Sequence, residues 1–223
     1  MKKRVLSLGL AAVMLVSLLT GCGSTKKIVA SETYEVLENP SVSVDGKWIV
    51  PGTDREVSFQ ADGTYTSTIS SSMNGEYVYY KDIEGFELAD QFKDIEYVVL
   101  SDENDEEKLF SAVLGDVMIG YYEHNQCYYF REDREIVPLE QFLGSWTDAL
   151  GGKYTMTLNA DGTGAIGDAD ELEDCTYSYD EETGYLDIIQ DDMVKQYAIG
   201  LYEGYLFAMP VGSYYNMYMY QPA

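Results

Sequence analysis

The chain has few of the residues on which most protein chemistry depends. Its 223 residues include one histidine, five prolines, two tryptophans and three cysteines. No zinc-ligand motif, Gly-x-Ser-x-Gly elbow, cysteine–histidine pairing or dinucleotide fingerprint is present. The histidine, His124, stands beside Asn125 and Gln126, a setting typical of an exposed turn rather than of a general base. We therefore predict that the protein is not an enzyme, with no catalytic residues, no metal site and no cofactor.

Positive charge is also scarce. The chain has 14 lysines and arginines against 39 aspartates and glutamates, a formal net charge of -25. Such a field repels phosphate groups, so we expect no nucleic-acid partner. Two acidic runs, residues 102–107 and 168–174, supply carboxylates for a divalent cation but lack a recognised ligand spacing, and charge runs are usually solvated loops. Cationic ligands stay open, beside the simpler interpretation that the charge keeps the protein soluble.

One long apolar segment stands at the amino terminus. Residues 2–4 are basic and an apolar run covers residues 5–19, the layout of a secretory signal. The run is shorter than the roughly 18 to 20 apolar residues that span a bilayer. It ends in Leu-Thr-Gly-Cys, which resembles the lipobox of bacterial lipoproteins. The resemblance implies that residues 1–21 are removed and that Cys22 carries a lipid. The alternative is an ordinary signal peptide followed by an incidental cysteine.

This interpretation predicts where the protein lies. Two acyl chains on Cys22 give stable anchoring, whereas one chain gives only reversible attachment. We expect the protein at the extracytoplasmic face of a bacterial cell membrane, in a Gram-positive organism. Residues 22–41 have low complexity and are predicted to form a flexible lipidated tether.

The rest of the chain contains an internal repeat. Residues 57–64, VSFQADGT, recur as MTLNADGT at 156–163, and each copy follows a Gly-x-Trp sequence, at 46–48 and 144–146. These are the only tryptophans, so their parallel placement indicates two homologous domains. The predicted boundaries are residues 42–133 and 139–223, joined by a linker at 134–138. Because the linker region is rich in apolar residues, we expect it to pack and to fix the relative orientation of the domains.

The repeated Asp-Gly has three competing interpretations: a phosphate-binding loop, a calcium loop or a hairpin turn. A phosphate loop needs a following helix, and the acidic spacing of a calcium loop is missing. Apolar residues alternate with polar ones before each Asp-Gly, as in a strand with one buried face. We predict two type I′ hairpin turns, in which both central residues have positive φ. The expected buried positions are Val57, Phe59 and Ala61, and then Tyr154, Met156, Leu158 and Ala160.

Short strands continue through both copies, with turn residues every 8 to 12 positions, and only residues 138–143 suggest a short helical turn. The predicted strands are 64–69, 95–100, 108–114, 117–122 and 127–132 in the first copy, and 186–190, 195–201, 205–209 and 214–220 in the second. The fold class predicted is all-β, with two tandem small antiparallel barrels, because closure removes exposed strand edges.

The pattern of Gly-x-Trp followed by a strand and Asp-Gly-Thr resembles the small lipocalin-like β-barrel domains of uncharacterised lipoproteins from Gram-positive bacteria. The resemblance covers both domains and implies that Trp48 and Trp146 close one end of each core. The second copy departs from the pattern because Gly164 stands where the first has Tyr65. The interior of the second domain is therefore less well defined.

Tyrosine is the most unusual component, with 21 residues. The ring suits both strand packing and ligand stacking, and we favour packing. The groups considered are Tyr77, Tyr79 and Tyr80; Tyr121, Tyr122, Tyr128 and Tyr129; and Tyr214, Tyr215, Tyr218 and Tyr220. Cys127 and Cys175 fall in different domains, and we expect buried free thiols rather than a disulfide.

These observations predict a monomeric, lipid-anchored binding or interaction protein for a small apolar or sugar-like ligand, or for a protein partner. No ligand-binding residues can be assigned from the sequence. The alternative is an envelope structural or inhibitory protein whose filled barrels act through their acidic outer surfaces. A carboxylate-dependent hydrolase is a third hypothesis. Interior volume separates the first two, because a drug-sized ligand needs roughly 300 Å³.

Overall fold

The computed structural model describes residues 15–17, 27–29, 35–68, 73–81, 92, 95–102, 107–122, 125–213 and 215–223, almost all of them in strands or turns. The strands before the linker are β1 (Leu15–Ser17), β2 (Lys27–Val29), β3 (Glu35–Val36), β4 (Gly46–Ile49), β5 (Glu56–Phe59), β6 (Thr64–Ser67), β7 (Met73–Lys81), β8 (Glu96–Asp102), β9 (Glu107–Leu114), β10 (Val117–Tyr122) and β11 (Asn125–Arg131). After it come the 3-10 turn η2 (Leu139–Gln141) and the strands β12 (Gly144–Asp148), β13 (Tyr154–Leu158), β14 (Thr163–Asp168), β15 (Glu171–Asp180), β16 (Tyr185–Gln190), β17 (Met193–Tyr202), β18 (Tyr205–Pro210) and β19 (Tyr218–Pro222).

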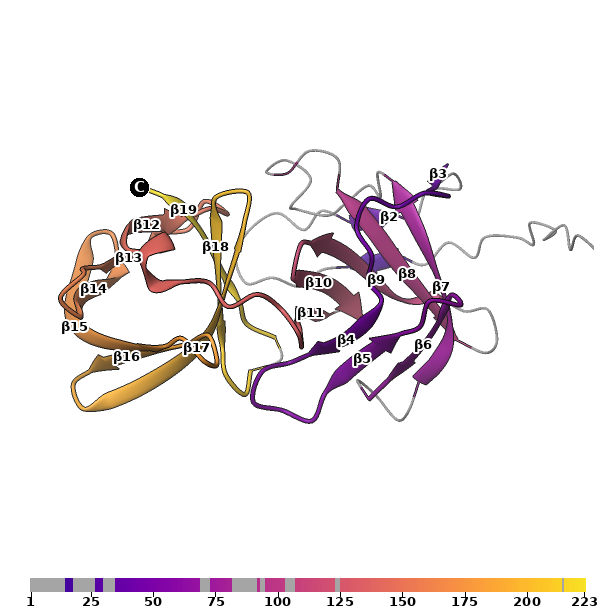
Figure 1. The fold of residues 1–223 in the computed structure, drawn as a ribbon. Coiled ribbons are helices and arrows are strands. Elements are labelled where there is room, and N and C mark those ends of the chain that lie inside the picture. Colours follow the sequence, from indigo (N-terminus) through magenta and orange to yellow (C-terminus); the bar gives the residue numbers. More distant parts are fainter. Residues whose placement is uncertain are drawn as a thin grey trace, which may run out of the picture.

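Two closed antiparallel barrels follow one another along the chain (Figure 1). In the first, strands β4 to β11 pair in sequence order, and the β4–β11 and β7–β8 pairings complete an eight-stranded ring. In the second, β12 to β19 form a ring closed by the β12–β19 pairing. This up-and-down arrangement of eight strands is consistent with a lipocalin-like fold. The predicted all-β class with two tandem barrels is confirmed.

Both Asp-Gly turns are hairpin turns, but not of the predicted type I′. Gly63 and Gly162 have φ of 88° and 82°, whereas neither preceding aspartate has positive φ. In the second copy Gly162 N–H donates to Asn159 O at 3.1 Å, and Asn159 N–H donates to Thr163 O at 2.9 Å. This is a three-residue loop, a type I turn followed by one left-handed glycine. A two-residue turn with both central φ values positive occurs instead at Asp191 and Asp192, with φ of 46° and 62°.

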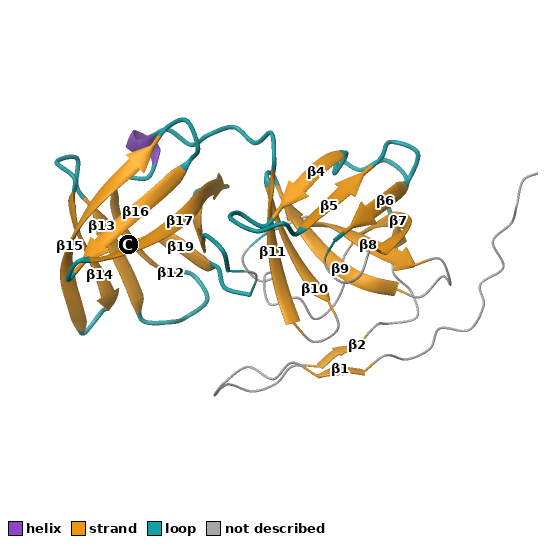
Figure 2. Cartoon of the chain, turned by 90° about the horizontal axis from the view of Figure 1, so that it is seen from below, coloured by secondary structure: helices purple, strands orange, loops and turns teal. Residues whose placement is uncertain are grey.

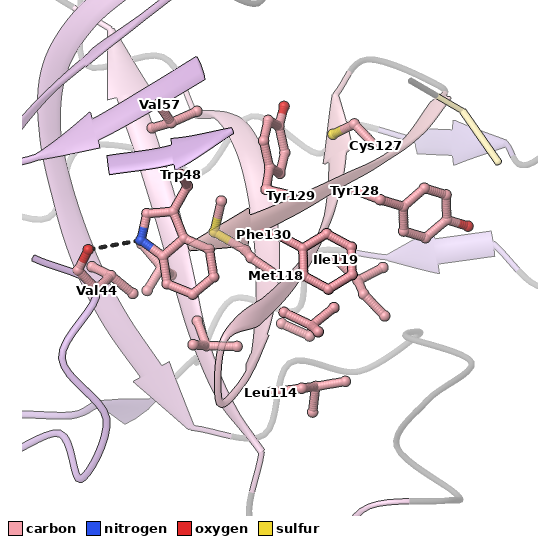
Figure 3. Packing of buried hydrophobic residues seen from close by; sticks show 14 of the residues in the cluster. Val44, Trp48, Val57, Leu114, Met118, Ile119, Cys127, Tyr128, Tyr129 and Phe130 are labelled. Carbon is pink, nitrogen blue, oxygen red and sulfur yellow. Dashed lines mark hydrogen bonds between the residues drawn. The ribbon is translucent and has the colours of Figure 1, made fainter. Parts of the chain in front are cut away.

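The repeat extends to individual hydrogen bonds. Trp48 Nε1–H donates to Val44 O at 2.9 Å, and Trp146 Nε1–H donates to Phe142 O at 2.8 Å, each four residues back along the chain. Both indoles are buried, and Figure 3 shows the first of these bonds beside the side chains packed around Trp48. A buried indole needs a partner for its N–H. Each indole therefore ties the first strand of its barrel to the segment that precedes it.

Most expected buried positions are confirmed. Val57, Phe59, Met156 and Leu158 lie in the two cores. Three expectations are wrong: Ala61 and Ala160 are exposed because they are loop residues of the Asp-Gly turns, and Tyr154 is 38% exposed at the end of β13.

Strands on one side of each barrel are buried on both faces. In β17 and β18, Ile199, Leu206 and Ala208 point into the second barrel, whereas the intervening Ala198, Phe207 and Met209 join the core cluster of the first. Because successive side chains of a strand point to opposite faces, this wall separates two apolar layers. We call the layer between the barrels the seam; Figure 2 shows the barrels side by side with the linker running between them.

The seam is tightly packed where the glycines of one barrel meet the other. A Cβ at Gly200 would lie 2.6 Å from Phe130 Cε1 and 3.0 Å from Val117 Cγ2. Gly212 N–H donates to Pro51 O across the seam at 2.8 Å. The expectation that the two domains pack against each other agrees with these contacts.

The remaining strand predictions hold with small shifts, and η2 confirms the helical turn. The predicted strand at 214–220 begins only at Tyr218. Within the predicted tether at 22–41, Glu35 and Val36 pair with Lys81 and Tyr80 of β7. Within the described part of the chain, no helix has the length and apolar character needed to cross a bilayer.

Candidate functional site between the two barrels

A cavity of about 210 Å³ opens at the seam beside the linker. Its walls come from three parts of the chain: the start of β10, the linker with η2, and the last residues of β17. The lining residues are Asp116, Val117, Arg134, Glu135, Ile136, Val137, Pro138, Gln141, Gly200 and Leu201. Neither barrel could form this cavity alone, because each contributes only one wall.

Arg134 is the only cation in the wall of the cavity. Its Nη2 donates to Thr183 O at 3.1 Å, and its Cζ lies 5.1 Å from the centre of the Phe130 ring. No carboxylate lies within ion-pair distance of Arg134 in the described residues, and its buried Nε–H has no hydrogen-bond acceptor there. Burial lowers the pKa of the guanidinium, which nevertheless stays charged at neutral pH. The partly buried guanidinium thus feels the charge of Asp116 but forms no direct ion pair among the described residues.

The packing around Arg134 explains the glycine at position 184. A Cβ there would lie 3.1 Å from Ile136 Cδ1 and 3.2 Å from Arg134 Nη2, and the residue has a φ of 72°. Glycine therefore allows the β15–β16 turn to lie against the linker. Tyr179 secures the same segment, since its hydroxyl donates to Val137 O at 2.6 Å. Burial raises the pKa of Tyr179 to about 12, so this hydroxyl stays protonated at neutral pH.

Two carboxylates also line the cavity. Asp116 Oδ1 forms an ion pair with Arg131 Nε at a distance of 3.2 Å. Arg131 in turn lies over the Trp48 ring, with its Cζ 4.7 Å from the ring centre. Asp116 is therefore part of the packing around Trp48 in the first barrel. Glu135 is exposed and has no partner of this kind in the described part. The cavity therefore has one cation and one carboxylate without an ion pair in a wall that also contains apolar side chains, and most of its surface is polar.

Large side chains pack the interior of the first barrel. Trp48, Tyr65 and Tyr129 are among the largest fully buried side chains. At Gly120 a Cβ would lie 2.9 Å from Ser111 Oγ and 3.1 Å from Cys127 Sγ, which leaves no space for a ligand atom at that level. The contacts at Gly120 favour a packed first barrel over a hollow one.

The tyrosine groups contribute mainly to packing. Tyr77 packs edge-on against Phe59 with ring centres 5.1 Å apart, and its hydroxyl donates to Gln60 O at 3.0 Å. The Tyr177 hydroxyl makes the same bond to Asn159 O in the second barrel. Tyr129 and Tyr220 are buried, whereas Tyr215 is exposed. The side chains of Tyr121, Tyr122 and Tyr214 lie outside the described residues.

The acidic run at 168–174 is exposed, but it is a hairpin rather than a loop. β14 and β15 pair from Asp168↔Glu171 onwards, so successive carboxylates alternate between the two faces of the hairpin. No group of three or more potential metal ligands occurs among the described residues. Residues 103–106 of the other acidic run, together with Cys22 and His124, lie outside them. Asn125 and Gln126 are strand residues of β11 rather than turn residues.

Cys127 and Cys175 are both buried and form no disulfide, as predicted. They lie in different barrels, and each packs beside a glycine of a neighbouring strand. Burial raises the pKa of the Cys175 thiol, which makes it a poor nucleophile at neutral pH.

Comparisons with family models, with curated proteins and with solved structures find no match to this chain. The class of the molecule therefore follows from its own geometry: it is a tandem β-barrel protein with a cavity between its barrels. Sequence reasoning missed the cavity. The available signal was Arg134, a basic residue in a strongly acidic chain, which is followed by Glu135 and then by the apolar residues Ile136 and Val137.

Proposed function

We propose that the protein is a lipid-anchored, extracytoplasmic, non-catalytic binding protein that takes a small ligand at the seam between its barrels. The observation that carries this proposal is the cavity of about 210 Å³ with Arg134 in its wall. Ligand sites favour interfaces between domains and combine apolar walls with a few polar groups. The volume equals about seven water molecules at their share of liquid volume, so the ligand is smaller than a typical drug.

The filled interior of the first barrel supports a site between the barrels rather than within one. A barrel that binds a ligand in its interior needs empty volume there, and the packing around Gly120 opposes this. At the seam, by contrast, the cavity remains although Gly200 and Phe130 pack closely beside it. Under this proposal the protein is a monomer, and the lipid on Cys22 is its contact with the membrane.

Two substitutions in η2 test the proposed site. Gln141 lines the cavity and is exposed, so Gln141→Trp would fill the cavity from its rim with little effect on the cores. Glu140→Trp is the matched control, because Glu140 is exposed in the same turn but does not line the cavity. A thermal-shift screen of small metabolites should find ligands that raise the Tm of the native protein and of Glu140→Trp, but not that of Gln141→Trp. Equal responses from all three proteins would remove the seam as the site.

The proposed anchor has its own test. Radiolabelled fatty acid should be incorporated into the protein in cells, and Cys22→Ser should abolish the label and release the protein from membranes. Labelling that persists in Cys22→Ser would refute lipidation at this cysteine.

A second candidate function, binding of a protein partner, is favoured by the far end of the second barrel. The ends of the hairpins β14–β15 and β16–β17, residues 168–174 and 191–196, are exposed there, and Gln190 Nε2–H donates to Glu173 Oε2 between the hairpins at 3.2 Å. Leu172, Met193 and Val194 are 47%, 60% and 61% exposed among acidic residues. Exposed apolar residues with a charged surround are typical of an interaction site. Val194→Glu should abolish cross-linking to a partner in whole cells, whereas Leu150→Glu, at another exposed apolar residue, should not.

A further inference from the structure

We infer that the ligand of the seam cavity is a zwitterionic α-amino acid with an apolar side chain. This inference rests on the proposed function and adds the chemical class of the ligand. It is drawn from Arg134 and Glu135, which both line the cavity, and from the apolar residues that line it with them.

The carboxylate of such a ligand would meet Arg134. A guanidinium has five donors, and in Arg134 one of them is used by Thr183 O, the buried Nε–H has no acceptor, and no carboxylate lies within ion-pair distance in the described part of the chain. A buried donor without an acceptor is unfavourable, and a bound carboxylate would supply acceptors and a charge closer than that of Asp116. The Phe130 ring below the guanidinium fixes its plane.

The ammonium group would meet Glu135. Asp116 lines the same cavity, but its carboxylate is already paired with Arg131 at 3.2 Å. Glu135 has no such partner among the described residues and is the acid left for a ligand cation. Apolar side chains of Val117, Val137 and Leu201 complete the wall and suit an aliphatic substituent.

The net charge of the protein favours a zwitterionic ligand over a simple carboxylate. At -25 the protein repels anions at long range, which slows and weakens their binding. A zwitterion has no net charge and therefore avoids this penalty. The volume agrees as well, since a cavity of about 210 Å³ has room for an amino acid of the size of leucine.

Titration calorimetry with three probes tests the inference on the full-length protein. The probes are L-leucine, 4-methylpentanoate, which lacks the ammonium, and 3-methylbutylamine, which lacks the carboxylate. We expect leucine to bind at least roughly tenfold more tightly than either analogue, because each analogue loses a charged hydrogen-bonding group. No binding of leucine at millimolar concentration, or equal binding of the amine, would overturn the inference.

Matched variants test whether Arg134 binds the ligand carboxylate and Glu135 binds its ammonium group. Arg134→Gln should weaken leucine binding roughly ten- to a hundredfold, and Lys153→Gln, the same change in charge at an exposed residue outside the cavity, should not. Arg134→Lys keeps the positive charge but lacks the planar guanidinium, so its affinity for leucine should lie between those of Arg134→Gln and Lys153→Gln. This variant provides a second measurement if Arg134→Gln fails to fold. Glu135→Gln should weaken leucine binding but leave 4-methylpentanoate unchanged. Equal leucine affinity in a folded Arg134→Gln protein overturns the inference.

Failure of the inference and failure of the proposed function give different results. If neutral or cationic compounds bind and Gln141→Trp blocks them, the seam is a ligand site but not one for amino acids. If leucine binds equally well to Gln141→Trp and Glu140→Trp, the cavity is not the site and both proposals fall.

Discussion

Phe207→Ala should uncouple the two barrels while leaving each of them folded. Phe207 is fully buried in the seam, where it stacks near Phe92 with ring centres 6.4 Å apart. Replacing a fully buried phenylalanine by alanine costs about 3–5 kcal/mol, because apolar contact is lost and a cavity remains. Since Phe207 points away from the interior of the second barrel, this cost should fall on the contact between barrels.

Leu206→Ala is the matched control. Leu206 is the preceding residue of β18, is equally buried and points into the second barrel. Its loss should cost about 2–5 kcal/mol, but within one barrel. Both variants should therefore lower the free energy of unfolding. In Phe207→Ala the loss weakens the contact between the barrels, whereas in Leu206→Ala it weakens the second barrel itself.

Urea unfolding and limited proteolysis distinguish the two outcomes. In the native protein we expect one cooperative transition and slow cleavage at residues 132–138. Phe207→Ala should give two transitions and rapid cleavage there, whereas Leu206→Ala should leave the linker protected under native conditions. A loss below about 1 kcal/mol in Phe207→Ala, with an intact linker, would refute the role assigned to the seam.

Three further predictions concern local structure. Gly162→Ala should destabilise the second barrel by about 1–2 kcal/mol in chemical denaturation, because its φ of 82° is unfavourable for alanine; an unchanged midpoint would contradict this. The Thr163 hydroxyl and backbone N–H lower the pKa of Asp161, so its contribution to stability is present above its unfolded pKa of about 4 and is lost as pH falls through the lower folded value. Melting curves between pH 2 and 7 should show a weaker acid dependence in Asp161→Asn than in the native protein, and identical curves would argue against it. In Cys22→Ser protein, a thiol reagent should find Cys127 and Cys175 unreactive until the chain unfolds, and rapid native labelling would show that the cores open readily.

Local patterns in the sequence were sufficient for the two-barrel fold. Alternation at Val57 and Phe59, and again at Met156 and Leu158, fixed which face of a strand is buried, and the repeat around the tryptophans fixed the number of units. The type of hairpin turn was not determined in this way. Asp-Gly is compatible with two- and three-residue loops, and the hydrogen bond from Gly162 N–H to Asn159 O in the closed sheet selects the longer one.

The sequence by itself therefore determined the class, the repeat and the faces of most strands, because side-chain alternation and turn chemistry act over a few residues. The seam and its cavity were decided only by tertiary structure. Runs such as Val117–Ile119 and Leu206–Met209 are apolar without alternation, which indicates burial on both faces but does not identify the partner surface. Only the packing of one barrel on the other places Gly200 against Phe130 and brings Arg134 to the wall of a cavity, since these contacts join residues far apart in the chain.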